Sequence, residues 1–271
     1  MEIRLESVDY ITKNSGKKVL DNVCLNIKSN LITTIVGSSG SGKTTLAEVI
    51  DLLLVPSNGI LKYNNEIVNS NDFKSRIGLV FQNPEEQFFA STVEKEIEFG
   101  LKYTNKDIDK IKKRVNDALK MVNLDESYLK RNPFTLSCGE KRKVAIASIL
   151  AFNPGVIIFD EPVLGLDSKS KKSLLKIIRL LKNRYNKTII IVTNDLEFAH
   201  LITDEVVVIN EGQIVLQGNK YDVFTQDVEQ YGLKKPRIIE FEQMVFNEKK
   251  VKLFYRDDIN DLMKDVYRNV K

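Results

Sequence analysis

The sequence lacks any apolar run long enough to form a membrane-spanning helix. Its continuous apolar runs, such as Val156–Phe159 and Ile189–Val192, have the length of strands, whereas a spanning helix needs about 18 or more consecutive apolar residues. The N-terminal stretch MEIRLESVDY alternates charged and apolar side chains, which predicts a strand rather than a signal peptide. If this protein acts at a membrane, we expect it to lie on the surface and to act through a partner.

Cysteine and histidine are also scarce. Cys24 and Cys138 lie far apart, and His200 is the only histidine, so we expect a reducing cytosolic compartment without a disulfide framework or a metal cluster. The 41 basic and 37 acidic residues are interspersed and leave a formal net charge of only +4. Nucleic-acid binding usually leaves a dense basic patch, so we expect no nucleic-acid partner.

The apolar pattern divides the chain into strand-rich and helical regions. The N-terminal part is β-rich, and a short strand, Leu31–Val36, leads towards a helical stretch, Thr44–Leu54. Between about residues 91 and 150 the apolar residues recur at helical spacing. Further strands are predicted at Gly59–Tyr63, Arg76–Phe81, Gly155–Asp160, Thr188–Thr193 and Glu205–Ile209. The last three are almost continuously apolar, which is typical of a buried parallel sheet, so we predict an α/β fold with a helical insertion.

The tail, residues 226–271, differs from the main domain, residues 1–225. A mixed segment, 226–256, precedes an apolar stripe at helical spacing. The stripe consists of Ile259, Leu262, Met263, Val266, Tyr267 and Val270. Asp257 and Asp258 precede it as expected cap residues. Because the stripe is separated from the main domain, we expect it to bury against a dimer partner.

A glycine- and serine-rich loop follows the strand Leu31–Val36 and precedes a helix. Its sequence GSSGSGKT fits the phosphate-binding pattern G-x-x-x-x-G-K-[ST]. Small residues let backbone N–H groups converge on phosphate oxygens, Lys43 adds a full charge, and the Thr44 hydroxyl reaches Mg²⁺. The predicted ATP ligands are Gly37, Ser38, Ser39, Gly40, Ser41, Gly42, Lys43, Thr44 and Thr45. By itself the loop indicates a nucleotide binder, a class that includes kinases and GTPases.

Two carboxylates, Asp160 and Glu161, end the strand that begins at Val156. A carboxylate in this place is suited to hold Mg²⁺, and its neighbour to act as general base on an attacking water. The alternative is an ordinary acidic strand end before the turn at Pro162. The pair alone does not decide between the two.

The segment Leu136–Glu140, with the sequence LSCGE, contains a capping box, Ser137 and Glu140, that opens a helix over Lys141–Leu150. It resembles the LSGGE or LSGGQ signature of ATP-binding-cassette (ABC) proteins, and it precedes the acid pair as it does in that family. The resemblance implies a dimer in which the signature helix faces the γ-phosphate held by the other subunit, so Ser137 and Gly139 would contact the partner's ATP.

Other segments extend the resemblance over most of the chain. Phe81-Gln82 resembles the Q-loop, which implies that Gln82 contacts Mg²⁺ or the attacking water. Gly165-Leu166-Asp167 resembles the D-loop, which implies that Asp167 lies at the dimer interface and contacts ATP. The base-recognition pattern N-K-x-D of GTPases is missing. The implied fold is a P-loop ABC cassette with a mainly parallel core sheet, an antiparallel β subdomain, an inserted helical subdomain and a short helical tail.

Three positions depart from the family pattern. Cys138 replaces a glycine and either crowds the opposite nucleotide or is a neutral variant, which we favour. Thr12 occupies the position where the family has an aromatic residue that stacks on adenine. Tyr10 either stacks on adenine instead or belongs to the core, and we favour the core. Asn194 replaces the switch histidine. Its amide can donate a hydrogen bond but cannot take up and pass on a proton as an imidazole can, which predicts slow ATP hydrolysis at this site. His200 is expected to be a packing or surface residue.

The stretch Val80–Phe89 and the segment Lys141–Ala147 resemble the ATPases of energy-coupling-factor (ECF) importers of vitamins and metal ions. This resemblance implies a second ATPase, a transmembrane coupling subunit and a membrane substrate-binding subunit as partners, and a tail that contributes to dimerisation. Nearby acids form either a solvated acidic face or a negative groove for basic coupling helices. These acids are Glu85, Glu86, Glu94, Glu96 and Glu98.

The sequence therefore predicts an ATP-hydrolysing subunit that uses ATP and Mg²⁺ and lies on the cytoplasmic face of the cell membrane. The predicted catalytic residues are Glu161, Gln82 and Asn194, and the predicted metal ligands are Thr44, Gln82 and Asp160. The alternatives are the ATPase of another ABC importer or a soluble ABC protein of DNA repair or translation. The soluble proteins usually carry tandem cassettes or a long coiled-coil insertion, and this chain has neither.

Overall fold

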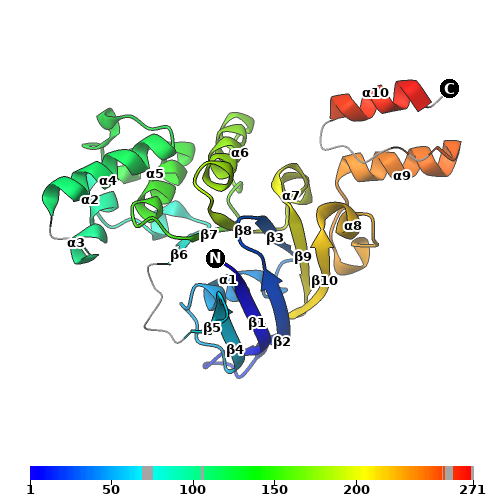
Figure 1. Ribbon diagram of the computed structural model, residues 1–271, viewed down its shortest axis with the longest axis horizontal. Helices are drawn as coiled ribbons and strands as arrows, with labels where there is room; N and C mark the ends of the chain where they lie inside the picture. The colour runs from blue at the N-terminus through cyan, green and yellow to red at the C-terminus, as the bar shows by residue number, and fades with distance from the viewer. Residues whose placement is uncertain (69–75, 105–106, 252, 254–258, 270–271) are drawn as a thin grey trace.

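The computed structural model describes residues 1–68, 76–104, 107–251, 253 and 259–269. A four-stranded antiparallel sheet has the order β2-β1-β4-β5. Its strands are β1 (Ile3–Ile11), β2 (Lys18–Ile27), β4 (Asn58–Tyr63) and β5 (Glu66–Ile67). This sheet lies at the bottom of Figure 1 and confirms the predicted antiparallel β subdomain.

The second sheet is the core of the molecule and has the order β10-β9-β3-β8-β7-β6. Its strands are β3 (Ile32–Val36), β6 (Ile77–Val80), β7 (Val156–Asp160), β8 (Thr188–Thr193), β9 (Glu205–Asn210) and β10 (Gln213–Asn219). The first five pair in parallel, and β10 is an antiparallel edge strand. Every residue of β3, β7 and β8 is buried, as expected for a sheet covered on both faces. Because β3, β8 and β7 are neighbours, the loops that follow them meet at one edge.

Helices of the inserted region lie to the left of this sheet in Figure 1. They are α2 (Val93–Glu98), α3 (Leu101–Thr104), α4 (Ile108–Met121) and α5 (Cys138–Leu150), with short 3-10 turns η1 (Pro84–Glu86), η2 (Glu126–Tyr128) and η3 (Pro133–Thr135). Leu119 of α4 and Val144 of α5 share a buried cluster with Phe159 of β7, so this region packs on the core sheet. Two further helices, α6 (Ser168–Asn183) and α7 (Leu196–Ile202), follow β7 and β8.

The helix after the phosphate-binding loop, α1 (Lys43–Ile50), is shorter than predicted. Asp51 caps its C-terminus, and Leu52 adopts a left-handed conformation with φ 62°. A left-handed residue ends helical hydrogen bonding, so the chain turns towards β4 several residues before Pro56. The apolar spacing through Leu54 predicted the longer helix because it does not report backbone conformation.

Three helices make up the C-terminal part, namely α8 (Lys220–Phe224), α9 (Arg237–Lys249) and α10 (Ile259–Asn269), with the turn η4 (Glu229–Tyr231) between the first two. The mixed segment 226–256 thus contains a helix, α9, that the apolar pattern did not predict. Asp257, Asp258 and Val270 lie outside the described residues. Within the described ranges, no helix combines the length and the apolar character required to cross a bilayer.

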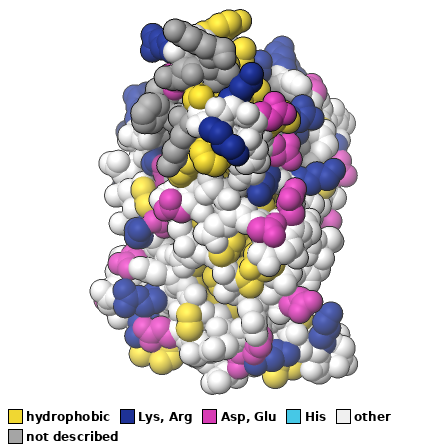
Figure 2. Space-filling view, turned by 90° about the vertical axis from the view of Figure 1, so that its right-hand side faces the viewer, with side chains coloured by type: hydrophobic (Ala, Val, Ile, Leu, Met, Phe, Trp, Pro, Cys, Tyr) yellow, Lys and Arg dark blue, Asp and Glu magenta, His cyan; other side chains and the backbone are white. Residues whose placement is uncertain are grey.

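The apolar stripe on α10 is divided between the core and the surface. Leu262 is fully buried in a cluster with Phe224 and Ile239, so the expectation that the stripe packs on a partner is wrong for Leu262. Met263 and Tyr267 remain 39% and 81% exposed. Figure 2, which faces the side of the molecule where α9 and α10 lie, shows hydrophobic side chains at the surface of this end. Helical periodicity alone could not distinguish the buried Leu262 from the exposed Met263 and Tyr267, because all three belong to one face of the helix.

A pair of substitutions on α10 tests this division. Leu262→Ala removes a fully buried side chain and should lower the free energy of unfolding by about 2–5 kcal/mol. Met263→Ala, at the adjacent partly exposed position, should change it by no more than about 0.5–1 kcal/mol. Urea unfolding of the two variants measures both values, and equal losses would contradict the packing of α10 on its own chain.

Candidate functional site

The loop between β3 and α1 has the backbone that its glycines allow. Gly40 and Gly42 have φ values of 79° and 104°, which glycine adopts at no steric cost. A Cβ atom at Gly37 would lie 2.3 Å from the carbonyl oxygen of Ile209, so this position has no room for a side chain. The loop and the start of α1 line a cavity of about 210 Å³, together with Val19.

Lys43 folds back over this loop. Its Nζ atom donates to the carbonyl oxygens of Gly37 and Ser38, at 2.9 and 2.8 Å. The side chain is 7% exposed, and burial lowers the pKa of Lys43, while Glu161 and Asp160 act in the opposite direction. A charged amine is therefore held in a partly dehydrated place beside the loop, where it can bind an anionic group strongly.

Asp160 and Thr44 form the part of the site suited to a metal ion. The Thr44 hydroxyl donates to Asp160 Oδ2 at 3.1 Å. Oδ1 of Asp160 is buried and has no hydrogen-bond partner among the described residues, and burial raises the pKa of this carboxyl. A buried oxygen without a partner is unfavourable unless a ligand completes it. Because Mg²⁺ prefers oxygen ligands, this pair fits the ion.

Glu161 is fixed in both backbone and side chain. Its φ is 40°, and its N–H donates to the Val192 carbonyl oxygen at 2.8 Å. The Thr193 hydroxyl donates to Oε2 at 2.9 Å, and the Asn194 N–H donates to Oε1 at 3.1 Å. Burial raises the pKa of Glu161, and the Thr193 bond lowers it. A strained backbone at a carboxylate held from β8 favours the functional interpretation of the acid pair over an ordinary strand end.

Asn194 and the phosphate-binding loop share a second, larger cavity. This cavity has a volume of about 590 Å³. It is lined by Ser38, Ser39, Asn194 and a stretch of the tail that includes Gly232, Leu233, Lys234 and Lys235. The switch position therefore lies beside the loop, and the tail approaches the same cavity, which the sequence did not predict.

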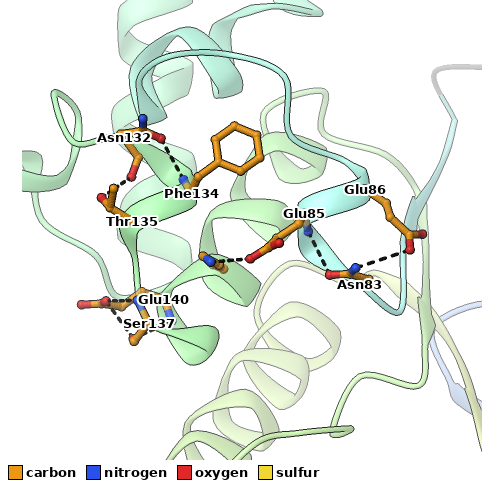
Figure 3. A network of polar contacts seen from close by, with 9 residues as sticks. Asn83, Glu85, Glu86, Asn132, Phe134, Thr135, Ser137 and Glu140 are labelled. Atoms are coloured by element: carbon orange, nitrogen blue, oxygen red, sulfur yellow. Dashed lines mark hydrogen bonds and ion pairs between the residues drawn. The ribbon is translucent and has the colours of Figure 1, made fainter.

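The signature segment opens α5 with the predicted capping box. Ser137 is the N-cap; its N–H donates to Glu140 Oε2 at 2.9 Å, and its Oγ accepts from the Glu140 N–H at 3.4 Å. Figure 3 shows these two residues at the start of the helix. The Tyr128 hydroxyl also donates to Glu140, which lowers the pKa of Glu140 to about 2. The helix begins at Cys138 rather than Lys141, because the residue after the N-cap is already helical.

The signature and the D-loop lie together, on a cavity separate from the phosphate-binding loop. Asp167 caps α6 and accepts from the Ser170 N–H at 2.7 Å. A Cβ atom at Gly139 would lie 2.7 Å from Ser170 Oγ. Ser137, Gly139 and Asp167 line a cavity of about 290 Å³ that includes no residue of the loop at 37–45.

Gln82 follows the end of β6 and is exposed. Its carbonyl oxygen accepts from Arg142 Nη1 of α5 at 2.8 Å. Arg142, Thr193 and Val19 contact or line the site and were missed in the sequence. Arg142 stands between two lysines, and no sequence signal marks it as the buried member of that basic run.

Three other residues that the sequence singled out have ordinary surroundings. Tyr10 is half-buried and packs against the cluster beneath the antiparallel sheet, as favoured from the sequence. His200 is 2% exposed, with its ring 6.3 Å from that of Phe224, so it is a packing residue. Cys138 is an exposed free thiol.

The acidic residues before and within α2 are mostly engaged. Glu96 is 4% exposed, and its Oε2 accepts from the Phe89 and Ala90 N–H groups. Glu85 pairs with Lys141, and Glu98 pairs with Lys102. These contacts favour local structural roles for three of the five acids over an open negative groove.

Comparisons with known proteins agree with this geometry. The family model described as ABC transporter matches residues 20–164. The energy-coupling factor transporter ATP-binding protein EcfA2 of Clostridium perfringens is 38% identical over 249 residues, which cover 88% of this chain and 87% of that protein. The energy-coupling factor transporter ATP-binding protein EcfA of Pediococcus pentosaceus is 39% identical over 240 residues, 86% of this chain and 85% of that protein.

A solved structure gives the same result for the fold. CbiO1 from Clostridium perfringens, described as part of the ABC transporter complex CbiONQ, superposes with a TM-score of 0.77 at 33% identity, covering 89% of this chain and 98% of that chain. The predicted family and fold are thereby confirmed. The chain belongs to the ABC transporter family, and it is an ATPase similar to the ATP-binding subunits of energy-coupling factor transporters.

Proposed function

We propose that this chain dimerises around MgATP and powers an ECF-type importer of a vitamin or a metal ion from the cytoplasmic face of the membrane. The observation that carries the proposal is the separation of two half-sites within one chain. The loop at 37–45 and the signature residues Ser137 and Gly139 line different cavities. A nucleotide enclosed by both therefore requires a second cassette, either another copy or a related ATPase.

In the proposed site, the loop binds the phosphates through its backbone N–H groups and Lys43. Thr44, Asp160 and Gln82 would hold Mg²⁺, which when bound neutralises charge on the phosphate oxygens. Ser137, Gly139 and Asp167 would contact the nucleotide of the partner. The Asp160 oxygen that finds no partner among the described residues supports this assignment.

For hydrolysis we assign Glu161 as the general base. Its carboxylate takes the proton of the attacking water while the water oxygen forms the bond to the γ-phosphorus and the bond to the bridging oxygen of ADP breaks. Thr193 and the Asn194 N–H orient the carboxylate. The Asn194 side chain would donate to a phosphate oxygen. Because an amide, unlike an imidazole, does not take up and release a proton near neutral pH, we expect this site to be slower than one with histidine.

Exposed aromatic side chains beside η1 are the proposed contact with the transmembrane coupling subunit. Phe89 and Phe99 are 58% and 44% exposed, with ring centroids 4.3 Å apart, and Phe134 is 43% exposed. Exposed aromatics grouped in this way are typical of interaction sites. Phe89 follows the Q-loop closely in the chain, and a contact there would connect the membrane subunits to the nucleotide site.

The tail is proposed to contribute to dimerisation through its exposed apolar side chains. Met244 and Phe246 of α9 are 55% and 49% exposed, and Ile259 and Tyr267 of α10 are 55% and 81% exposed. Leu262 remains inside the chain's own core, so only the outer part of the stripe is available to a partner.

Affinity purification from detergent-solubilised membranes tests the proposed function. The tagged chain should recover an ABC ATPase partner and integral membrane proteins. Phe89→Asp should lose the membrane proteins, whereas Ile67→Asp, at a 60% exposed position on β5, should retain them. Recovery of soluble proteins alone would contradict a role in transport.

The hydrogen bond from Thr193 gives a prediction about pH. Glu161 acts as a base only when deprotonated, so the rate should fall as pH falls through its raised pKa. Thr193→Val removes a donor that lowers this pKa, and it should therefore shift the acid limb of the kcat profile upward by about one pH unit. Thr34→Val is the matched control, since Thr34 is buried on the adjacent β3 and its hydroxyl has no hydrogen-bond partner among the described residues. Superimposable acid limbs for the three proteins would refute the role of Thr193.

A further inference from the structure

Arg142 is a buried cation on the signature helix. It lies one turn after Gly139 in α5 and is 3% exposed. Burial lowers the pKa of Arg142, and its Nε atom is buried with no hydrogen-bond partner in the part of the chain that the structure describes. Burying a charge costs free energy unless polar contacts offset it. The hydrogen bonds that Arg142 does form therefore indicate which segment the buried guanidinium holds in place.

Both hydrogen bonds of Arg142 are made to the Q-loop. Nη1 of Arg142 donates to the carbonyl oxygen of Phe81 at 3.0 Å and to that of Gln82 at 2.8 Å. These two residues follow the end of β6, where the backbone leaves the core sheet. Burial raises the pKa of Asp160, and the charge of Arg142 acts in the opposite direction. One guanidinium therefore connects α5 with the segment that carries Gln82 and acts electrostatically on the metal-binding carboxylate.

Two further side chains of the same segment contact α5. Lys141 pairs with Glu85 of η1, and Gln87 Nε2 donates to the Ala145 carbonyl oxygen at 3.0 Å and to Ser148 Oγ at 2.7 Å. Figure 3 shows Asn83 and Glu85 beside the helix that Ser137 and Glu140 begin. The segment 81–87 is thus fixed to α5 at both of its ends and in the middle.

From this arrangement we infer that Arg142 is a positioning residue that sets Gln82 and ties the Q-loop of one nucleotide site to the signature helix that serves the other. This inference rests on the proposed composite site. A displacement of α5 by the partner's nucleotide would move the carbonyl oxygens of Phe81 and Gln82 through Arg142. Binding at one site would thereby change the position of Gln82 at the other.

Hydrogen exchange on the nucleotide-free chain tests the attachment without reference to activity. Arg142→Met replaces the guanidinium group with an unbranched apolar side chain and so removes both hydrogen bonds. The backbone amides of residues 81–83 and 85–87 should therefore exchange about tenfold faster or more. Lys143→Met is the matched control, because the neighbouring Lys143 of α5 donates instead to the carbonyl oxygen of the exposed Asn123, at 3.4 Å. In Lys143→Met, the backbone amides of the segment 81–87 should exchange at the same rates as in the wild type. Unchanged exchange in Arg142→Met would overturn the positioning role.

A double-mutant cycle with Gln82 then tests whether Arg142 acts through it. Arg142→Met should lower kcat by about ten- to a hundredfold, and Arg142→Lys, which keeps the charge, should recover part of that loss. In a Gln82→Ala background, Arg142→Met should have a further effect within about threefold, because residues that act as a unit are not additive. Fully additive losses would overturn the inference. An unchanged kcat in Gln82→Ala alone would instead refute the role proposed for Gln82, and the exchange result would still decide whether Arg142 holds the segment.

Discussion

Glu161→Gln is expected to lower the rate of ATP hydrolysis by about 10²–10⁴-fold while ATP binding is retained. Glutamine has nearly the same shape as glutamate, and its carbonyl oxygen can still accept the Asn194 N–H that Glu161 Oε1 accepts at 3.1 Å. What is lost is the capacity to take a proton from water. Because ATP then persists between the two cassettes, the variant should form a dimer with MgATP on size-exclusion chromatography.

The matched control for this variant is Glu48→Gln. Glu48 is a half-buried carboxylate on α1 whose pKa is also raised by burial, and it bears no role in the proposed chemistry. It should hydrolyse ATP at a rate close to that of the wild type. A Glu161→Gln protein that turns over ATP normally, or remains monomeric with MgATP under all conditions, would contradict the assignment of the base and of the composite site.

Those parts of the site that depend on local sequence were predictable. The loop from Gly37 to Thr44 needs glycines where φ is positive, and the glycines at 40 and 42 occupy such positions. The capping box of Ser137 and Glu140 is likewise local, since its partners are three residues apart. The sheet was predictable because the apolar runs at β7 and β8 are buried on both faces, which is the pattern of parallel strands.

Features that depend on distant neighbours were not predictable. Arg142 and Lys143 are adjacent basic residues, yet Arg142 is buried against Phe81 and Gln82, 61 and 60 positions away, while Lys143 is not. Leu262 and Met263 belong to one apolar stripe, and the packing of α10 on Phe224 and Ile239 decides which of them is covered. Periodicity identifies a face of a helix, but what that face contacts is a tertiary property.

Lys43→Ala should weaken ATP binding by about ten- to a hundredfold. A hydrogen bond that involves a charged group is worth about 1.5–3 kcal/mol, and about 1.4 kcal/mol corresponds to a factor of ten in affinity. Lys43 is only 7% exposed, so solvent screens its charge little. The amine of Lys43 donates to the carbonyl oxygens of Gly37 and Ser38, and we expect it to exchange part of these contacts for the β- and γ-phosphates when ATP binds.

Titration calorimetry with ATP and with AMP separates this effect from damage to the loop. AMP lacks the β- and γ-phosphates, so its affinity should change much less than that of ATP in Lys43→Ala. Lys62→Ala is the control for removal of a lysine, because Lys62 pairs with Glu6 on the antiparallel sheet and has no place in the proposed site. An ATP affinity unchanged in Lys43→Ala would refute the phosphate-binding role of the loop, and equal losses for ATP and AMP would show that the substitution acts on loop structure rather than through the charge at the terminal phosphates.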